Sequence, residues 1–230
     1  MTSPRFAACV FDAYGTLFDV GSVVSEADAL APGHGADLAR VWRAKQLEYS
    51  WLSGLMASPS CRRPDFRDVT AMALDYAVAT LVLPIDAEGR AELADAYLRL
   101  RAYPDAAAAL TALAPRPRWI LSNGTSDMLA PLVDASGLAA HLDGVISVDE
   151  ADAYKPSPQV YALAADRLGV DPRSVAFVSA NGWDAAGAQA FGFTAFWINR
   201  AEAPVERHAA APAHVVGSLA EVAAIVAGRR

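Results

Sequence analysis

The feature that most constrains the fold is a series of short apolar runs, each of which stops at a polar residue. Strands of a parallel sheet that is covered on both faces are apolar throughout, whereas half-exposed strands alternate. Helix-like stretches separate the runs, and this alternation predicts an α/β fold with a doubly wound, mainly parallel sheet. The expected strands are 6–11, 118–121, 144–148, 175–178 and 193–198, with 214–216 as an edge strand.

Three of the intervening helices carry end signals. The expected helices 126–136, 158–168 and 184–191 are each followed by a glycine, which favours the backbone turn that ends a helix. The second opens with serine and then proline, which suit the N-cap and the first helical position. These signals support the strand–helix alternation.

Residues 18–100 break this pattern. They contain no clear strand but at least three helical stretches, 37–56, 66–83 and 87–100. One crossover helix would suffice to connect two parallel strands, so we interpret this segment as an inserted helical cap. The core is then expected to comprise residues 1–17 and 101–230.

Composition excludes several classes of protein. A hydrophobic content of 54% supports a buried core, and a net charge of −7 argues against a nucleic-acid partner. No apolar stretch approaches the roughly 20 residues that span a bilayer. An anionic substrate would therefore be attracted by local cations and backbone N–H groups rather than by the overall charge.

The cysteines and histidines match no metal-binding pattern. Cys9 and Cys61 are isolated, and the first residues are too soon interrupted to resemble a secretory signal, so we expect free thiols in a cytoplasmic protein. The histidines lie outside every motif. We therefore expect no metal and no cofactor. The histidines are His34, His141, His208 and His214.

Polar residues follow three of the predicted strands. Asp12 follows the first strand, Ser122 and Asn123 follow the second, and residues 179–184 follow the fourth. In open α/β sheets, ligands bind at the carboxyl ends of the strands, so these segments should converge. Asp12 alone would be read as a turn or cap residue; its convergence with the other segments favours a reactive carboxylate.

Five segments together resemble a known family. FDAYGTLFDV, VWRAKQLEYSWL, LSNG, YKPSPQVY and SANGWDAAGAQAFGF are similar, in this order, to motifs of the L-2-haloacid dehalogenases within the haloacid dehalogenase superfamily. The resemblance spans about residues 6–200. It implies a Rossmann-like core, a helical cap, and hydrolysis of short 2-haloalkanoic acids to 2-hydroxy acids.

Two departures separate this chain from the phosphatases of the superfamily. Tyr14 stands where phosphatases carry a general-acid aspartate, and the segment 179–184 has a single carboxylate, Asp184. Mg²⁺ prefers several oxygen ligands, so this is a poor metal site. A phosphatase or phosphonate hydrolase is the weaker hypothesis. A non-catalytic binding module is a further alternative, because fold alone does not establish function.

The resemblance assigns catalytic roles. Asp12 is the nucleophile that forms an ester with inversion at carbon, and Lys155 and Thr16 keep it ionised and oriented. Asp184, alone or together with Lys155, activates the water that cleaves the ester. The remaining residues of this group, Ser179 and Asn181, support Lys155, Asp12 and the water.

The resemblance also assigns binding roles. A halide cradle is expected from Arg43, Asn123 and Trp183, although Arg43 alone could be a surface residue and Trp183 a core aromatic. The substrate carboxylate is expected at Ser122 and at backbone N–H groups after Asp12. Many members of the resembling family carry a polar residue at the position of Ala44. This difference leaves open which alkyl chain length of the substrate is preferred. The other expected binding residues are Ala13, Tyr14, Leu47, Phe66 and Tyr161, the last of which could instead position Lys155 or be structural.

Apolar side chains crowd one stretch of the expected cap helix. Trp51, Leu52, Leu55 and Met56 cannot all face the core. An exposed apolar patch of this size usually marks an interface. We therefore expect a homodimer, as resembling enzymes often form.

Overall fold

The computed structural model describes residues 6–228 and contains a six-stranded, fully parallel sheet. The strand order β3-β2-β1-β4-β5-β6 reverses direction at β1, as in a doubly wound sheet. The predicted fold class is therefore confirmed, including the edge strand β6. The strands are β1 Ala8–Phe11, β2 Arg118–Ser122, β3 Gly144–Ser147, β4 Val175–Ser179, β5 Thr194–Ile198 and β6 His214–Val216.

The central strands are buried along their whole length, which explains why their sequences do not alternate. Every residue of β1 and β4 is buried. In the register, Phe11 lies opposite Ile120 of β2 and Val178 of β4. The three strands thus end at the same edge of the sheet, where Asp12 follows β1.

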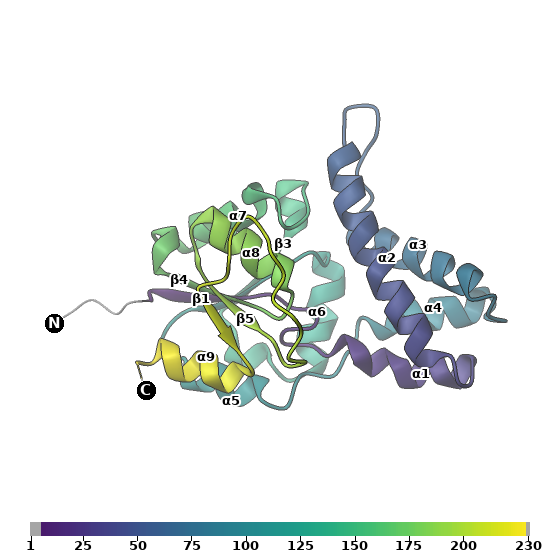
Figure 1. Cartoon of the computed structure of the whole chain (residues 1–230), viewed down its shortest axis with the longest axis horizontal. Helices are drawn as coiled ribbons and strands as arrows, with labels where there is room; N and C mark the ends of the chain where they lie inside the picture. Colours follow the sequence, from purple (N-terminus) through teal and green to yellow (C-terminus); the bar gives the residue numbers. More distant parts are fainter. Residues whose placement is uncertain (1–5, 229–230) are drawn as a thin grey trace.

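Helices cover both faces of this sheet. The helix pair α5 (Ala106–Ala112) and α9 (Leu219–Val226) packs on one side, and the pair α7 (Pro158–Leu168) and α8 (Gly182–Phe191) on the other (Figure 1). A further helix, α6 (Ser126–Ala135), joins β2 to β3. The sequence patterns predicted α6, α7 and α8 but not the short, alanine-rich helices α5 and α9.

The inserted segment forms four α-helices that stand beside the sheet (Figure 1). The first, α1, was not predicted. The longest helix packs closely on α3, where Trp42 Nε1 donates to the Thr70 carbonyl at 2.8 Å. Its far end projects beyond the core. The cap helices are α1 Val24–Leu30, α2 Gly35–Met56, α3 Phe66–Thr80 and α4 Ala87–Ala96.

Two cap helices end earlier than expected. After α3, Val82 adopts a left-handed conformation with φ of 53°, and Leu83 N donates back to the Val78 carbonyl. Glycine is the usual residue in this conformation at a helix end, and valine rarely adopts it. Because Val82 stands here instead of glycine, the end of α3 carries no signal in the sequence. After α4, the backbone hydrogen bonds span three residues rather than four, as in the bond from Arg99 N to the Ala96 carbonyl. The regular α-helix therefore ends before residue 100.

The chain enters and leaves the cap at one place. Asp19 N donates to the Arg101 carbonyl at 2.8 Å, and Tyr103 N donates to the Leu17 carbonyl at 2.9 Å. The two connecting segments therefore run side by side. The expected division, with 18–100 as cap and 1–17 with 101–230 as core, stays a prediction.

Candidate active site

Three donors hold the Asp12 side chain at the carboxyl edge of the sheet. Its Oδ1 accepts a hydrogen bond from Lys155 Nζ at 3.1 Å. Its Oδ2 accepts from Thr16 Oγ1 at 3.0 Å and from Asn181 Nδ2 at 2.8 Å. The side chain is nearly buried. Both carboxylate oxygens are thus fixed in one orientation, as an aimed nucleophile requires.

The turn after Asp12 fixes the direction of the Thr16 hydrogen bond. Gly15 adopts φ of 88°, a conformation that glycine takes without strain and that returns the chain toward the sheet. Thr16 Oγ1 accepts from Ala180 N at 2.8 Å. Its single hydroxyl proton is therefore available to Asp12.

Lys155 joins Asp12 to a second carboxylate. Its Nζ lies 2.9 Å from Asp184 Oδ2, and both side chains are completely buried. Burial acts to lower the pKa of Lys155, but the carboxylates of Asp12 and Asp184 outweigh it, and the pKa is raised. Burial raises the pKa of Asp184, the charge of Asp12 adds to this rise, and Lys155 opposes it. A buried carboxylate with a raised pKa is suited to act as a base.

Tyr161 contacts Asp184 rather than Lys155. Its hydroxyl donates to Asp184 Oδ1 at 2.8 Å, and its side chain is completely buried. Burial raises the pKa of Tyr161, so the hydroxyl stays protonated and remains a donor. Through this bond Tyr161 holds the Asp184 carboxylate in one orientation, and its expected place in the substrate site stays a prediction.

Asn123 and Ser122 bring free donors to the same edge. Asn123 Oδ1 accepts from Lys155 N at 3.0 Å, and no acceptor among residues 6–228 takes the protons of its Nδ2. Ser122 Oγ accepts from Gly124 N at 3.1 Å, which leaves its hydroxyl proton available. In the described part of the chain, the backbone N–H groups of Ala13 and Tyr14 also have no acceptor. These donors could hold an anion beside Asp12.

The cap contributes Arg43 to this site. Arg43 Nη2 lies 3.5 Å from Asn181 Oδ1, and Nη1 donates to Gln46 Oε1 at 2.6 Å. Arg43 pairs with no carboxylate among the described residues, so its charge is available to an anion. Leu47 and Trp51 follow at intervals of four residues on the same face of α2.

Aromatic rings close the cap side of the site. Tyr14 packs against Phe66 and Tyr97, with 5.7 Å between ring centroids in both pairs. Its buried hydroxyl finds no hydrogen-bond partner in residues 6–228. Burial raises the pKa of Tyr14, so the ring remains neutral. Phe66 also contacts Tyr154, the residue before Lys155.

Sequence comparison assigns the chain to a family. The model of the haloacid dehalogenase-like hydrolases matches residues 6–192. The chain belongs to this family. An (S)-2-haloacid dehalogenase of Xanthobacter autotrophicus is 51% identical over 193 residues, which are 84% of this chain and 75% of the relative. The (S)-2-haloacid dehalogenase 1 of Pseudomonas sp. strain CBS-3 is 46% identical over 94% of both chains.

A solved structure of a relative bears on the chemistry. The L-2-haloacid dehalogenase of Xanthobacter autotrophicus with chloropropionic acid covalently bound superposes with a TM-score of 0.89 at 43% identity, covering 98% of this chain and 100% of the relative. The fold of this hydrolase is therefore that of the L-2-haloacid dehalogenases. In the relative, the acid is attached covalently.

The space between the two carboxylates of this hydrolase is filled by an ammonium group. Lys155 Nζ contacts both Asp12 and Asp184. Within residues 6–228, no three histidine, cysteine, aspartate or glutamate side chains are grouped so that they could hold a metal ion. The donor set of this site thus fits a lysine-bridged carboxylate pair better than a Mg²⁺ ion.

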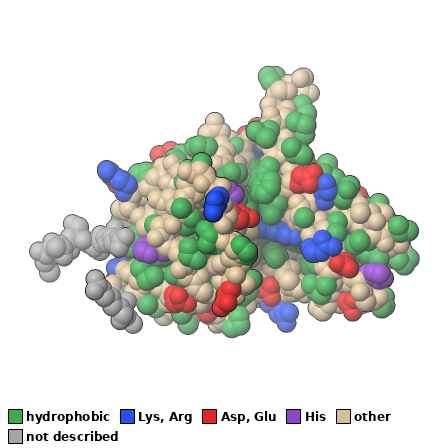
Figure 2. Space-filling view, in the orientation of Figure 1, with side chains coloured by type: hydrophobic (Ala, Val, Ile, Leu, Met, Phe, Trp, Pro, Cys, Tyr) green, Lys and Arg blue, Asp and Glu red, His purple; other side chains and the backbone are tan. Residues whose placement is uncertain are grey.

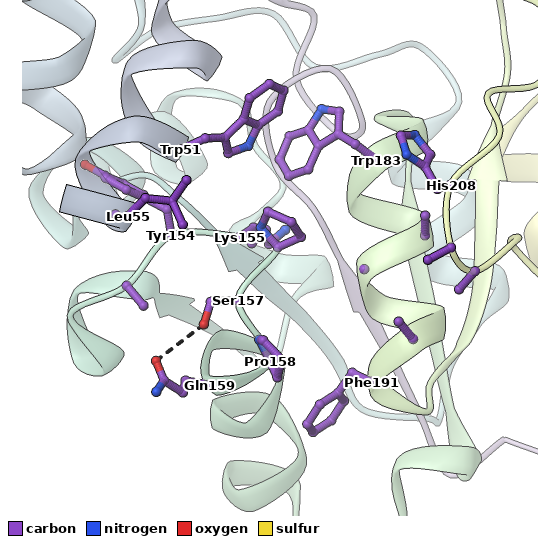
Figure 3. A pocket seen from close by; sticks show the side chains of 18 of the residues that line it. Trp51, Leu55, Tyr154, Lys155, Ser157, Pro158, Gln159, Trp183, Phe191 and His208 are labelled. Atoms are coloured by element: carbon purple, nitrogen blue, oxygen red, sulfur yellow. Dashed lines mark hydrogen bonds between the residues drawn. The ribbon is translucent and has the colours of Figure 1, made fainter. Parts of the chain in front are cut away.

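Trp183 borders two cavities of the hydrolase. A cavity of about 800 Å³ lies between the end of α2 and the core, and Trp51, Lys155 and Trp183 are among its lining residues (Figure 3). The Trp51 and Trp183 rings meet edge to face at 5.3 Å. A second cavity of about 370 Å³ is lined by Asn181 and Trp183 among others. Asp12 is not among the lining residues of either cavity.

Several contacts of the hydrolase were not anticipated from its sequence. Ser179 Oγ accepts from Asn181 N at 3.1 Å, so it supports Asn181 and has no direct bond to Lys155 or Asp12. Gln46 was missed; its spacing of three residues from Arg43 on a helix is the signal that could have revealed it.

Proposed function

We propose that this hydrolase is an (S)-2-haloacid dehalogenase, which converts short 2-haloalkanoic acids to 2-hydroxy acids. The observation that carries the proposal is the Asp12 carboxylate, which is bonded at both oxygens and shares Lys155 with a second buried carboxylate, Asp184. The names of the relatives support the substrate class, and the acid covalently bound in one of them supports an ester intermediate.

The first step is attack of Asp12 on the halogen-bearing carbon. A carboxylate oxygen forms the new C–O bond, the carbon–halogen bond breaks, and its electron pair leaves with the halide. Attack from the back inverts the carbon. Arg43, the Nδ2 of Asn123 and the edge of Trp183 form the cradle for the halide, because each presents positive charge or a donor where negative charge develops.

The second step is hydrolysis of the ester. Water attacks the carboxyl carbon of Asp12, the acyl bond breaks, and the hydroxy acid leaves with one original Asp12 oxygen. Asp184 accepts the water proton, and its raised pKa makes it a stronger base than an ordinary aspartate. Tyr161 orients Asp184, and Asn181 and Lys155 hold the Asp12 carboxyl group in place.

The remaining donors and apolar groups bind the substrate. Its carboxylate is held by the Ser122 hydroxyl and by backbone N–H groups at Ala13 and Tyr14. Its alkyl side faces apolar walls contributed by both the cap and the core. We assign these walls to Tyr14, Leu47, Phe66 and Trp183.

The route of oxygen tests this mechanism. In a single turnover in ¹⁸O water, the product should carry unlabelled oxygen at C2, and Asp12 should become labelled. Later turnovers should label the product. A first product that carries ¹⁸O while Asp12 stays unlabelled would show that water attacks the substrate directly, and would overturn the role of Asp12.

We also propose that the hydrolase is a homodimer that pairs through its cap. On α2, Trp51 faces the core, whereas Leu52, Leu55 and Met56 are 44%, 83% and 60% exposed. Apolar side chains are visible along the projecting end of the cap (Figure 2). A second copy of this chain would bury this patch.

Sedimentation tests the dimer. The wild type should sediment as a dimer at micromolar concentration, and the double variant Leu55→Lys with Met56→Lys should shift toward monomer. Val205→Lys is a matched control, since Val205 is 63% exposed on a loop of the core. A wild type that is monomeric, or a double variant that remains dimeric, contradicts the proposed interface.

We propose that the hydrolase is cytoplasmic. Within residues 6–228, no helix is long and apolar enough to cross a membrane. Cys61 is an exposed free thiol and Cys9 a buried one. Exposed free thiols persist in a reducing compartment, which favours a cytoplasmic location.

A further inference from the structure

A chain of buried hydrogen bonds lies behind Arg43 in the cap. Arg43 Nη1 donates to Gln46 Oε1 at 2.6 Å, and Gln46 Nε2 donates to Thr70 Oγ1 at 2.7 Å. Thr70 Oγ1 donates to the Phe66 carbonyl at 2.6 Å. Gln46 is completely buried and Thr70 nearly so. This chain joins α2 to α3.

The chemistry of Thr70 determines which way the Gln46 amide points. A hydroxyl has one proton, and that of Thr70 is used by the Phe66 carbonyl. Toward Gln46, Thr70 can therefore only accept, so the NH₂ end of the amide must face Thr70. The oxygen of the amide then faces Arg43, where a donor-only guanidinium needs an acceptor.

The same directionality continues on the other side of Arg43. Asn181 Nδ2 donates to Asp12 Oδ2 at 2.8 Å, so Asn181 Oδ1 is turned toward Arg43 Nη2 at 3.5 Å. That contact is long and therefore weak. Arg43 is thus held firmly from behind and only loosely on the side that faces Asp12.

The acceptor behind Arg43 is uncharged. A glutamate at this position would hold the guanidinium equally well but would offset its charge. An amide oxygen positions Arg43 and leaves its full positive charge for an anion in front. Tyr97 also faces this pair, and its hydroxyl is kept neutral because burial raises its pKa.

We propose that Gln46, oriented by Thr70, is a positioning residue that aims Arg43 at the departing halide without neutralising it. This inference rests on the proposed dehalogenase function and adds to it the reason why the cap presents an uncompensated cation. It also predicts that the effect of Gln46 depends on the leaving group. Chloride concentrates its charge more than bromide and depends more on a nearby cation.

The test compares charge, orientation and leaving group. The variants Gln46→Glu and Thr70→Val are assayed for single-turnover halide release from 2-chloropropionate and 2-bromopropionate, with Thr70→Ser as the matched control that keeps the hydroxyl. Gln46→Glu should slow chloride release about tenfold or more, as expected when transition-state charge is less well stabilised. Bromide release should slow less, and in the steady state kcat for 2-chloropropionate should fall more than KM rises.

Thr70→Val should show the same chloride-to-bromide bias, because the amide loses the acceptor that orients it, and Thr70→Ser should resemble the wild type. Equal slowing with both halides would mean a merely structural role and would overturn the proposal. Circular dichroism checks the fold; if Gln46→Glu fails to fold, the Thr70→Val and Thr70→Ser pair decides.

Arg43→Met separates the inference from the proposed function. If Arg43→Met slows halide release about 100-fold or more while Gln46→Glu and Thr70→Val match the wild type, the positioning role is wrong and the halide cradle stands. If Arg43→Met itself is near wild type, the assignment of Arg43 to the halide fails, and the inference fails with it.

Discussion

Replacing Lys155 by methionine tests the centre of the site, because it removes the charge between Asp12 and Asp184 while nearly preserving side-chain length. The ammonium lies 3.1 Å from one carboxylate and 2.9 Å from the other, and all three side chains are at most 8% exposed. Two unit charges about 3 Å apart attract by ~5 kcal/mol at an effective dielectric constant of about 20. Desolvation and repulsion between the carboxylates offset part of this attraction.

Measurements on other buried ion pairs indicate the net loss of stability to expect. Removing one partner costs about 3–5 kcal/mol, because it leaves an uncompensated buried charge. The free energy of unfolding of Lys155→Met should therefore fall by about 3–5 kcal/mol near pH 8. Turnover should be lost, because a carboxyl group that takes up a proton to relieve the repulsion can serve neither as nucleophile nor as base.

The sign of the pH dependence follows from the raised pKa of Lys155. In the wild type, the stabilisation by Lys155 is fully present below its ordinary pKa of 10.5 and is lost only as the pH rises through the higher value in the folded state. In the variant, the facing carboxylates destabilise the fold at neutral pH, and protonation relieves them. The difference between the two proteins should therefore narrow as the pH falls from 8 toward 5.

Urea unfolding followed by tryptophan fluorescence measures this difference at both pH values. Lys45, the other lysine of the chain, supplies the control. It pairs with Glu48 on the cap surface, so Lys45→Met should change stability little. A loss for Lys155→Met no larger than that of an exposed ion pair, about 1 kcal/mol, would refute the reasoning. So would a difference that stays the same from pH 8 to pH 5.

Three further predictions concern the acid limb, the cap and metal. The pKa of Asp184 is raised above the ordinary value of 3.8. As the pH is lowered, kcat should therefore begin to fall at a pH above 3.8, and a fall that begins only at or below pH 3.8 argues against Asp184 as the base. Arg63 from the cap pairs with Asp149 and Asp152 of the core at 3.3 and 3.2 Å. Arg63→Met should lower the free energy of unfolding by about 2 kcal/mol and raise KM, whereas exposed Arg62→Met should do neither. Halide release should be unchanged by a strong chelator, and activity that returns only with Mg²⁺ would favour a phosphatase-like site.

The architecture and the position of the Asp12 carboxylate at the edge of the sheet could be predicted from the residues alone. Unbroken apolar runs allow a strand to be buried on both faces, so their order predicts a parallel sheet without knowledge of contacts. Polar residues at the ends of such strands meet at one edge, which is why Asp12, Asn123 and Asp184 could be grouped from their positions alone. Helix ends marked by a glycine, such as the end of α7 at Gly169, could also be predicted from the sequence.

Other features were decided only by the tertiary structure. The end of α3 depends on Val82 in a left-handed conformation, which no local signal indicates. From the sequence, Tyr161 could line the substrate site, position Lys155 or be structural, and only the packing of α7 on α8 shows that its hydroxyl contacts Asp184.

Two features of the cap also depend on contacts that form only after folding. Trp51 contacts Trp183 of the core, whereas Leu55, one turn further along α2, lines the same cavity but remains 83% exposed. The direction of the Gln46 amide depends on Thr70, a residue on another helix. The physical reason is common to all of these features. A strand or helix follows from neighbours in sequence, whereas the partner of a hydrogen bond and the exposed side of a helix follow from segments that meet only after folding.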